Sequence, residues 1–255
     1  MKTIGIALSG GGARGVAHLG VLKALKEFGV MPNMLSGSSA GAMVAAFYAS
    51  GYSDEEIMEI TTGSRFFSLA HFHIGKSGLF DMGGFEEIYH QHFPQNSFEA
   101  LSIPIHIAAT DIVRGESKYY SSGDLAKIIM ASSCVPTVFE PVEYEGHTLL
   151  DGGILNNLPI EPLLGNCDKL IGVYVNSLST SADNLLMKNL PDRTFHLAIS
   201  QRERAKASKC QLFIEPVNMS QFGMFEIHQA KQIYDYAYEY TKGLKAEIEA
   251  FMADR

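Results

Sequence analysis

The chain has 255 residues, of which 46% are hydrophobic and 19% are charged. That balance excludes a disordered chain and suits one large α/β domain with a substantial buried core. The formal net charge of -8 disfavours a nucleic-acid partner, because binding a phosphate backbone needs a concentrated basic face. We find no internal repeat and no linker, and therefore expect a single domain over residues 1–255.

Signals for membranes, metals and export are weak. The longest apolar run, residues 40–49, is well short of the roughly 20 residues that span a bilayer. The first apolar segment is too short for a signal peptide, so we expect a cytoplasmic protein that contacts membranes at most peripherally. Three widely spaced cysteines indicate neither a disulfide framework nor a zinc site. We predict no metal and no cofactor.

Short apolar runs alternate with longer amphipathic stretches along the chain, which predicts a mostly parallel sheet covered by helices. Four runs are expected to be strands: "TIGIALSG" (residues 3–10), "IPIHIAATDI" (103–112), "TLLDGG" (148–153) and "KLIGVYVNS" (169–177).

Helices are predicted at four places. The first extends from about Arg14 to Phe28 and the second covers residues 40–49. Ser53 and Glu56 form the pattern of a capping box, which opens a third helix. Apolar positions over residues 225–251 predict a long C-terminal helix, broken at Gly243 and packed on the sheet.

Residues 64–84 are aromatic-rich and interrupted by glycines, and they fit neither a helical nor a strand period. We predict a loop there. A loop packed over the core and a lid that lines an acyl groove both fit this composition.

The stretch "SGSSAG" (residues 36–41) contains three serines before an apolar helix. A nucleophile elbow turns sharply from strand to helix and needs small residues two before and two after the catalytic residue. Only Ser39 has glycine at both positions, Gly37 and Gly41. We therefore predict Ser39 as a nucleophile, and a tight turn without a catalytic role is the alternative.

A run of three glycines, Gly10, Gly11 and Gly12, follows the first predicted strand. Such a loop exposes consecutive amides at a helix N-terminus, which suits an oxyanion, and Arg14 adds positive charge. Gly10, Gly12 and Gly15 also match the dinucleotide fingerprint G-x-G-x-x-G. That fingerprint expects a carboxylate about 20 residues later, and none is present.

A serine nucleophile needs a base, and Asp151 ends an apolar run before two glycines. Burial would raise the pKa of this carboxyl toward the working pH. A Ser-Asp-His order would instead need His196 or His228, but both lie in segments with helical character rather than in a loop after a strand. The pairs His71/His73 and His90/His92 have no further ligands near them in sequence, so we do not favour a metal site.

At this point four blocks resemble the patatin-like phospholipase family, and more narrowly its short bacterial members similar to the catalytic domain of neuropathy target esterase. The blocks occur in the family's order between about residues 4 and 176: "GGGARGVAHLGVLKAL", "GSSAG", "ASSCVPTVFEPV" and "DGGILNNLP". The combination is far more specific than any one block.

The resemblance implies a three-layer α/β/α sandwich and a dyad of Ser39 and Asp151 without a histidine. It also implies an oxyanion hole from the glycine loop, helped by Arg14. Members of this family hydrolyse carboxylic esters of phospholipids, lysophospholipids or acylglycerols through an acyl-serine intermediate, without a metal. The expected partner is therefore a lipid or ester substrate, with transient contact at a membrane surface.

Two alternatives stay open. One is a Ser-Asp-His esterase of the α/β-hydrolase type, and the other is a non-catalytic lipid-binding or regulatory protein on the same fold. The sequence carries no signal for an oligomeric state.

Overall fold

The structure is a computed structural model that describes residues 2–63, 71–72, 78–81, 83–178, 190–224 and 226–253. Its centre is an eight-stranded sheet with the order β11-β10-β1-β2-β5-β9-β8, in which β6 also pairs with β5. The strands are β1 (Ile4–Leu8), β2 (Met34–Ser38), β5 (Ile105–Asp111), β6 (Glu116–Tyr120), β8 (Val142–Tyr144), β9 (His147–Asp151), β10 (Lys169–Val173) and β11 (Leu212–Ile214).

The four predicted strands are confirmed as β1, β5, β9 and β10. Strands β11, β10, β1, β2 and β5 are parallel, as expected from the alternation of strands and helices. Strands β6, β9 and β8 are antiparallel to their neighbours. The β5–β6 connection explains part of this edge, because residues 112–115 form a turn too short for the crossover that a parallel pair needs.

One edge of β5 is shared by two strands. Strand β2 pairs with its first part, ending where Ser38 lies opposite Ala108. Strand β9 approaches from the other direction and pairs from Ala109, which lies opposite Asp151. Because β6 occupies the other edge of β5 over the same residues, β2 and β9 must meet end to end. This register brings the end of β2 beside Asp151.

The helices are α1 (Ala17–Glu27), α2 (Ala40–Ala49), α3 (Asp54–Thr62), α5 (Gly83–His92), α6 (Leu125–Ser132), α7 (Leu190–Ala205), α8 (Ala230–Gly243) and α9 (Lys245–Ala253). The second predicted helix is confirmed as α2, and the capping box of Ser53 and Glu56 is present at α3. The first predicted helix needs correction, because residues Gly12–Val16 form a 3-10 turn before α1 begins.

The sheet buries side chains on both faces. Ile6 and Leu8 of β1 belong to a large core that includes α1, whereas Ala7 between them packs with Leu158 and Tyr174 in a smaller cluster. Successive side chains of β1 therefore pack on opposite faces of the sheet, in two separate layers, as a three-layer α/β/α sandwich requires.

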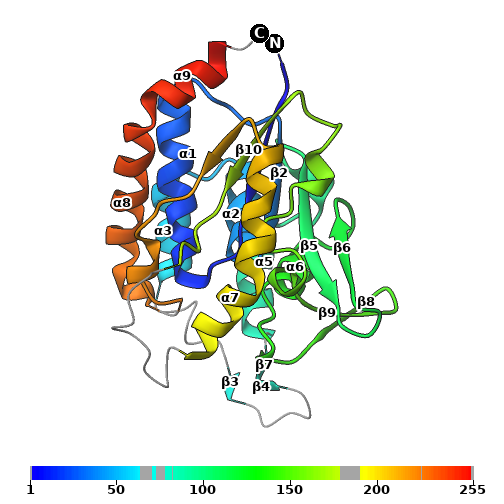
Figure 1. The fold of residues 1–255 in the computed structure, drawn as a ribbon. Coiled ribbons are helices and arrows are strands. Elements are labelled where there is room, and N and C mark those ends of the chain that lie inside the picture. The colour runs from blue at the N-terminus through cyan, green and yellow to red at the C-terminus, as the bar shows by residue number, and fades with distance from the viewer. Residues whose placement is uncertain are drawn as a thin grey trace.

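The C-terminal segment is not one helix on the sheet. It divides at Leu244 into α8 and α9, next to the predicted break at Gly243. Helix α8 lies along α1 (Figure 1) and packs mainly against it, while α9 reaches β11. The prediction that this segment packs on the sheet is therefore wrong for α8, which covers a helix of the layer beneath.

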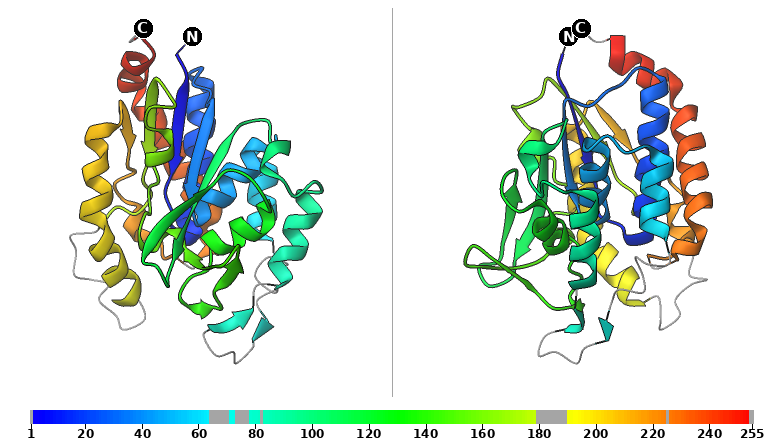
Figure 2. Two further views of the ribbon diagram at one scale, coloured as in Figure 1. Left: turned by 90° about the vertical axis from the view of Figure 1, so that its right-hand side faces the viewer. Right: turned by 180° about the vertical axis from the view of Figure 1, so that it is seen from behind.

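Part of the predicted loop at residues 64–84 is strand. β3 (His71–Phe72) and β4 (Gly78–Asp81) form a small sheet with β7 (Thr137–Phe139). Most of the remaining residues of this segment lie outside the described residues, and the lid hypothesis concerns these residues. Both termini lie at one end of the molecule, opposite this small sheet (Figure 2). Among the described helices, none has the length and apolar character that crossing a bilayer requires.

Candidate active site

Ser39 forms the turn between β2 and α2. Its backbone has φ 52° and ψ -124°, a conformation that costs a side-chain-bearing residue about 1–3 kcal/mol. The surrounding bonds hold it there. The Ser39 amide donates to Ser132 Oγ at 2.9 Å, and its carbonyl accepts from the amides of Ala42 and Met43 at 2.9 and 3.1 Å. The strained turn leaves the Ser39 side chain 9% exposed.

The two flanking glycines are required by close backbone contacts. A Cβ at Gly41 would lie 2.3 Å from the carbonyl oxygen of Leu8, and one at Gly37 would lie 2.5 Å from the amide nitrogen of Ala42. Both contacts are with backbone atoms, which cannot move aside as a side chain can. Glycine at both positions is what allows β2 to turn this sharply into α2.

Asp151 ends β9, and its Oδ1 accepts the Gly153 amide at 2.7 Å. The Ser39 hydroxyl acts on the same carboxyl and lowers its pKa. The Asp151 amide donates to Cys134 O at 2.9 Å. Burial raises the pKa of Asp151 to about 6, although the Ser39 hydroxyl and the Gly153 amide oppose the rise. A carboxylate with this pKa is a better base near neutral pH than an exposed aspartate.

The glycine loop lies against the elbow. A Cβ on Gly10 would come within 3.2 Å of Ser39 Cβ. The Gly10 amide donates to Asn157 O at 3.0 Å, so it is already engaged. For the amides of Gly11 and Gly12, the described part of the chain offers no acceptor. Within the described residues, these two amides are therefore the glycine-loop donors without an acceptor.

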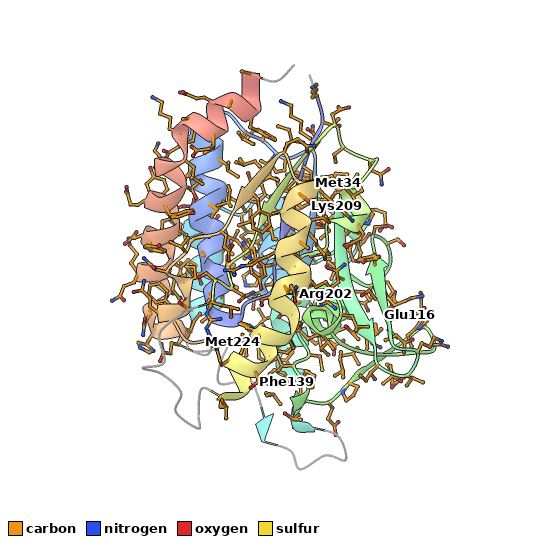
Figure 3. All side chains as sticks on the ribbon, viewed as in Figure 1. Met34, Glu116, Phe139, Arg202, Lys209 and Met224 are labelled. Atoms are coloured by element: carbon orange, nitrogen blue, oxygen red, sulfur yellow. The ribbon has the colours of Figure 1, made fainter. Side chains whose placement is uncertain are left out.

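Met224 covers the other side of the glycine loop. Its carbonyl accepts the Ala13 amide at 2.8 Å, and a Cβ on Gly12 would lie 2.4 Å from that carbonyl oxygen. Gly12 also has φ +56°, which favours glycine. Met224 lies in the lower half of the molecule, whereas Met34 at the start of β2 lies in the upper half (Figure 3). The loop thus lies near the carboxyl ends of the parallel strands.

Arg14 is buried and anchors the loop. Its Nε donates to Phe222 O at 2.7 Å, and its Nη1 lies 3.5 Å from Asn176 Oδ1. The sequence predicted positive charge beside the oxyanion loop. The structure adds that this guanidinium joins the loop to a segment more than 200 residues later.

Several residues around the site had no signal in the sequence. Ser132 holds the Ser39 amide, and His18 Nε2 lies 2.7 Å from the carbonyl oxygen of Ser9, just before the glycine loop. Burial lowers the pKa of His18 to about 4, so the ring is neutral near pH 7 and donates through Nε2. Asn157 and Asn176 contact the loop directly. Ser132, His18 and Asn157 lie inside the recognised blocks, but only the tertiary contacts mark them.

The histidines considered from sequence lie elsewhere or have other partners. His228 is exposed in the 3-10 turn Ile227–Gln229, and His196 is buried on α7. His92 Nδ1 lies 3.2 Å from the Tyr52 hydroxyl, and His90 lies 3.7 Å from Glu86. The side chains of His71 and His73 lie outside the described residues. The two groups that lower the pKa of Asp151 are a serine hydroxyl and a glycine amide.

A family model described as patatin-like phospholipase matches residues 6–164, which include the glycine loop, the elbow and Asp151. The chain belongs to the patatin-like phospholipase family. An NTE family protein of Mycobacterium bovis is 36% identical over 176 residues, covering 68% of this chain and 49% of that protein. This patatin-like chain thus spans about half the length of that relative.

Longer relatives match as well. Neuropathy target esterase sws of Drosophila sechellia is 34% identical over 169 residues, which cover 62% of this chain and 11% of the esterase. Human patatin-like phospholipase domain-containing protein 6 is 29% identical over 279 residues, covering 95% of this chain and 20% of the human protein. The patatin-like chain corresponds to a small part of each.

Solved structures share the fold. VipD from Legionella pneumophila has a TM-score of 0.62 at 16% identity, covering 98% of this chain and 67% of VipD. The type III effector protein ExoU has a TM-score of 0.54 at 14% identity, covering 99% of this chain and 54% of ExoU. The patatin-like fold therefore extends beyond the segment that the family model matches.

Proposed function

We propose that this chain hydrolyses carboxylic ester bonds of lipids, with Ser39 as nucleophile and Asp151 as base. The observation that carries the proposal is Ser39 at a strained elbow, where its hydroxyl acts on the buried Asp151 carboxyl and lowers its pKa, beside two amides for which the described residues offer no acceptor. Membership of the patatin-like phospholipase family and the relatives named as esterases support a phospholipid or lysophospholipid as substrate.

The first half of the reaction forms an acyl-enzyme. Asp151 takes the proton of the Ser39 hydroxyl while Oγ attacks the ester carbonyl carbon, and the carbonyl electron pair moves to oxygen. The amides of Gly11 and Gly12 stabilise this oxyanion. When the carbonyl reforms, the bond to the alcohol oxygen breaks, and the leaving alcohol takes the proton from Asp151.

The second half returns the free enzyme. Asp151 accepts a proton from a water molecule, whose oxygen attacks the acyl carbon of the ester on Ser39. The second oxyanion occupies the same amides. Its collapse breaks the bond to Ser39 Oγ, which takes the proton from Asp151 and releases the fatty acid. A single carboxyl with a pKa of about 6 serves as base in both halves.

The substrate class implies contact with a lipid surface. Long-chain esters are presented from membranes or micelles, so we expect peripheral and transient contact there. A protein that only binds lipid on this fold would have no need of a nucleophile paired with a base. The experiment below separates the two roles.

The first experiment is labelling with a fluorophosphonate, followed by mass mapping of the modified peptide. We expect the label on Ser39 in the wild-type chain and none after Ser39→Ala. Asp151→Asn should slow labelling about 100-fold or more, in the range typical for loss of general base catalysis. Ser208→Ala, an exposed serine whose hydroxyl donates to Ala205 O, is the matched control and should label at the wild-type rate.

The alternatives give different results. Loss of labelling in a His196→Ala/His228→Ala variant, with Asp151 intact, would indicate a Ser-Asp-His triad. Folded wild-type protein that takes no label and turns over no ester would refute the proposal and leave lipid binding. Label that survives loss of both histidines and depends on Asp151 supports the dyad.

A further inference from the structure

Two buried asparagines join the glycine loop to the segment that follows Asp151. Asn176, just beyond β10, donates from Nδ2 to Gly10 O at 2.6 Å and to Asn157 Oδ1 at 3.0 Å. Asn176 is 0% exposed and Asn157 is 2% exposed. Burying a carboxamide costs free energy unless its polar atoms form hydrogen bonds. The bonds made by these two side chains therefore favour one orientation of each.

The Asn157 carboxamide occupies space that two glycines leave open. A Cβ on Gly10 would lie 2.7 Å from Asn157 Nδ2, and so would a Cβ on Gly153. The added atom on Gly10 would also lie 3.2 Å from Ser39 Cβ, and the one on Gly153 would lie 2.9 Å from Asp151 Oδ1. The carboxamide of Asn157 therefore lies beside Gly10, which adjoins the nucleophile, and beside Gly153, which adjoins the base.

Helix α7 and the turn that follows it hold the backbone next to Asn157. The Leu158 amide donates to Glu203 Oε2 at 3.0 Å, and the Leu158 carbonyl accepts from Lys206 Nζ at 2.7 Å. Glu203 and Lys206 are themselves paired at 2.8 Å and are both buried. Both backbone groups of the residue after Asn157 are thus bonded to buried charges, which limits movement of this segment.

We propose that Asn157 and Asn176 are positioning residues for hydrolysis at Ser39, holding the Gly11 and Gly12 amides in reach of the oxyanion and coupling that loop to Asp151. This inference rests on the proposed function. Amide donors must lie about 2.7–3.1 Å from the position of the oxyanion, so a small displacement of the loop weakens both bonds. Because the oxyanion forms only after attack, the loss falls on kcat rather than on KM.

The first test is Asn176→Asp, measured as kcat and KM on a soluble short-chain p-nitrophenyl ester. The change keeps the size of the side chain, removes its donor toward Gly10 O, and places the new carboxylate by Arg14, which can pair with it. We expect kcat to fall about 10- to 100-fold, as for loss of part of an oxyanion hole, with KM changed less than about threefold. Asn166→Asp is the control, because Asn166 is exposed and should keep wild-type kinetics.

Folding is measured separately from positioning. The rate constant of fluorophosphonate labelling at Ser39 depends only on the molecules that can react. The final labelled fraction reports how much of the protein is folded. A loss of kcat by Asn176→Asp should therefore be matched by a slower labelling rate constant at full final labelling.

The second test is Asn157→Asp, measured as the pH dependence of kcat/KM. The new carboxylate and Asp151 Oδ1 would both lie next to Gly153. Repulsion between the two negative charges should raise the pKa of Asp151 further. The acid limb, expected near pH 6 in the wild type, should shift upward by about one pH unit. The nearby Cys134 thiol stays neutral in this range, since burial raises its pKa to about 12.

Two results would overturn the inference: an Asn176→Asp variant with kcat within twofold of wild type, or an Asn157→Asp variant whose acid limb does not move. Failure of the proposed function is a different result, namely wild-type protein without ester turnover and without label on Ser39.

Discussion

Asp151, which we propose as the base, destabilises the fold when it is ionised. An aspartate in an unfolded chain has a pKa of about 3.9, whereas burial raises the pKa of Asp151 to about 6 in the folded protein. The folded state therefore binds the proton more tightly. The contribution of Asp151 to stability is highest below the unfolded pKa and falls as pH rises through about 6, by roughly 3 kcal/mol in all.

Replacing the base should consequently stabilise the protein while abolishing its activity. Asp151→Asn keeps an acceptor for the Gly153 amide and removes the charge, so the free energy of unfolding should exceed that of wild type by up to about 3 kcal/mol at pH 7 to 8. The difference should vanish below about pH 4. Urea denaturation at a series of pH values measures it.

Asp111→Asn is the matched control with the opposite sign. Hydrogen bonds from His147 and Arg114 hold the pKa of Asp111 below its usual range, so its ionised form stabilises the fold above the unfolded pKa. Stability should fall in this variant at neutral pH. An Asp151→Asn variant that loses stability at neutral pH, as Asp111→Asn does, would contradict our account of Asp151.

At the scale of elements, the packing of α1 against α8 depends on a single glycine. A Cβ on Gly20 of α1 would lie 2.4 Å from the Tyr234 carbonyl oxygen and 2.9 Å from the Tyr238 amide nitrogen of α8. Both are backbone atoms of the facing helix. The missing Cβ therefore sets the distance between α1 and α8, although glycine is a poor helix former.

Gly20→Ala should therefore destabilise the protein despite the better helix propensity of alanine. We expect a loss of about 1–3 kcal/mol in the free energy of unfolding, because α8 must move away from α1. Gly243→Ala, at the end of α8, adds its Cβ where no atom lies within 4 Å, and should leave stability unchanged or slightly higher. Equal behaviour of the two variants would show that packing at Gly20 is not decisive.

Local signals predicted elements best where one segment alone determines its structure. The capping box at Ser53 needs only four residues, and α2 begins and ends where its apolar run does. The 3-10 turn before α1 was missed because it packs against residues that are distant in sequence. Met224 lies close to Gly12, and Ala40 lies close to Gly15. The small sheet of β3, β4 and β7 was missed because two of its strands have three residues or fewer.

Over the whole molecule, residues beyond the matched family segment complete the site. The family model ends at residue 164, yet three later residues bond to this region. Asn176 bonds to Gly10, Met224 to Ala13 and Phe222 to Arg14. Lys206 and Glu203 brace the segment after Asp151. The C-terminal third therefore contributes support rather than the proposed chemistry.

The buried charges near α7 offer a test of this support. Lys206→Met removes the donor to Leu158 O and one of the two cations paired with Glu203, while Arg202 Nε still pairs with Glu203 at 2.7 Å. We expect a loss of about 1–3 kcal/mol in the free energy of unfolding. Lys209→Met, at an exposed lysine of the same turn, should change stability by less than about 0.5 kcal/mol (Figure 3). Equal denaturation midpoints for the two variants would show that the brace is not needed.

The sequence by itself was enough to predict the nucleophile and the base that we propose. Glycines at two fixed offsets pointed to Ser39 among three serines. The end of an apolar run before two glycines pointed to Asp151, and the resemblance of four blocks implied the same pair. These signals are local, because a sharp turn and a short motif each depend on neighbouring residues only. Tertiary structure alone decided how these residues meet. Strands β2 and β9 share one edge of β5, and Asn176 lies 166 residues from the carbonyl it holds. Such contacts follow from strand register and packing, which no local pattern encodes.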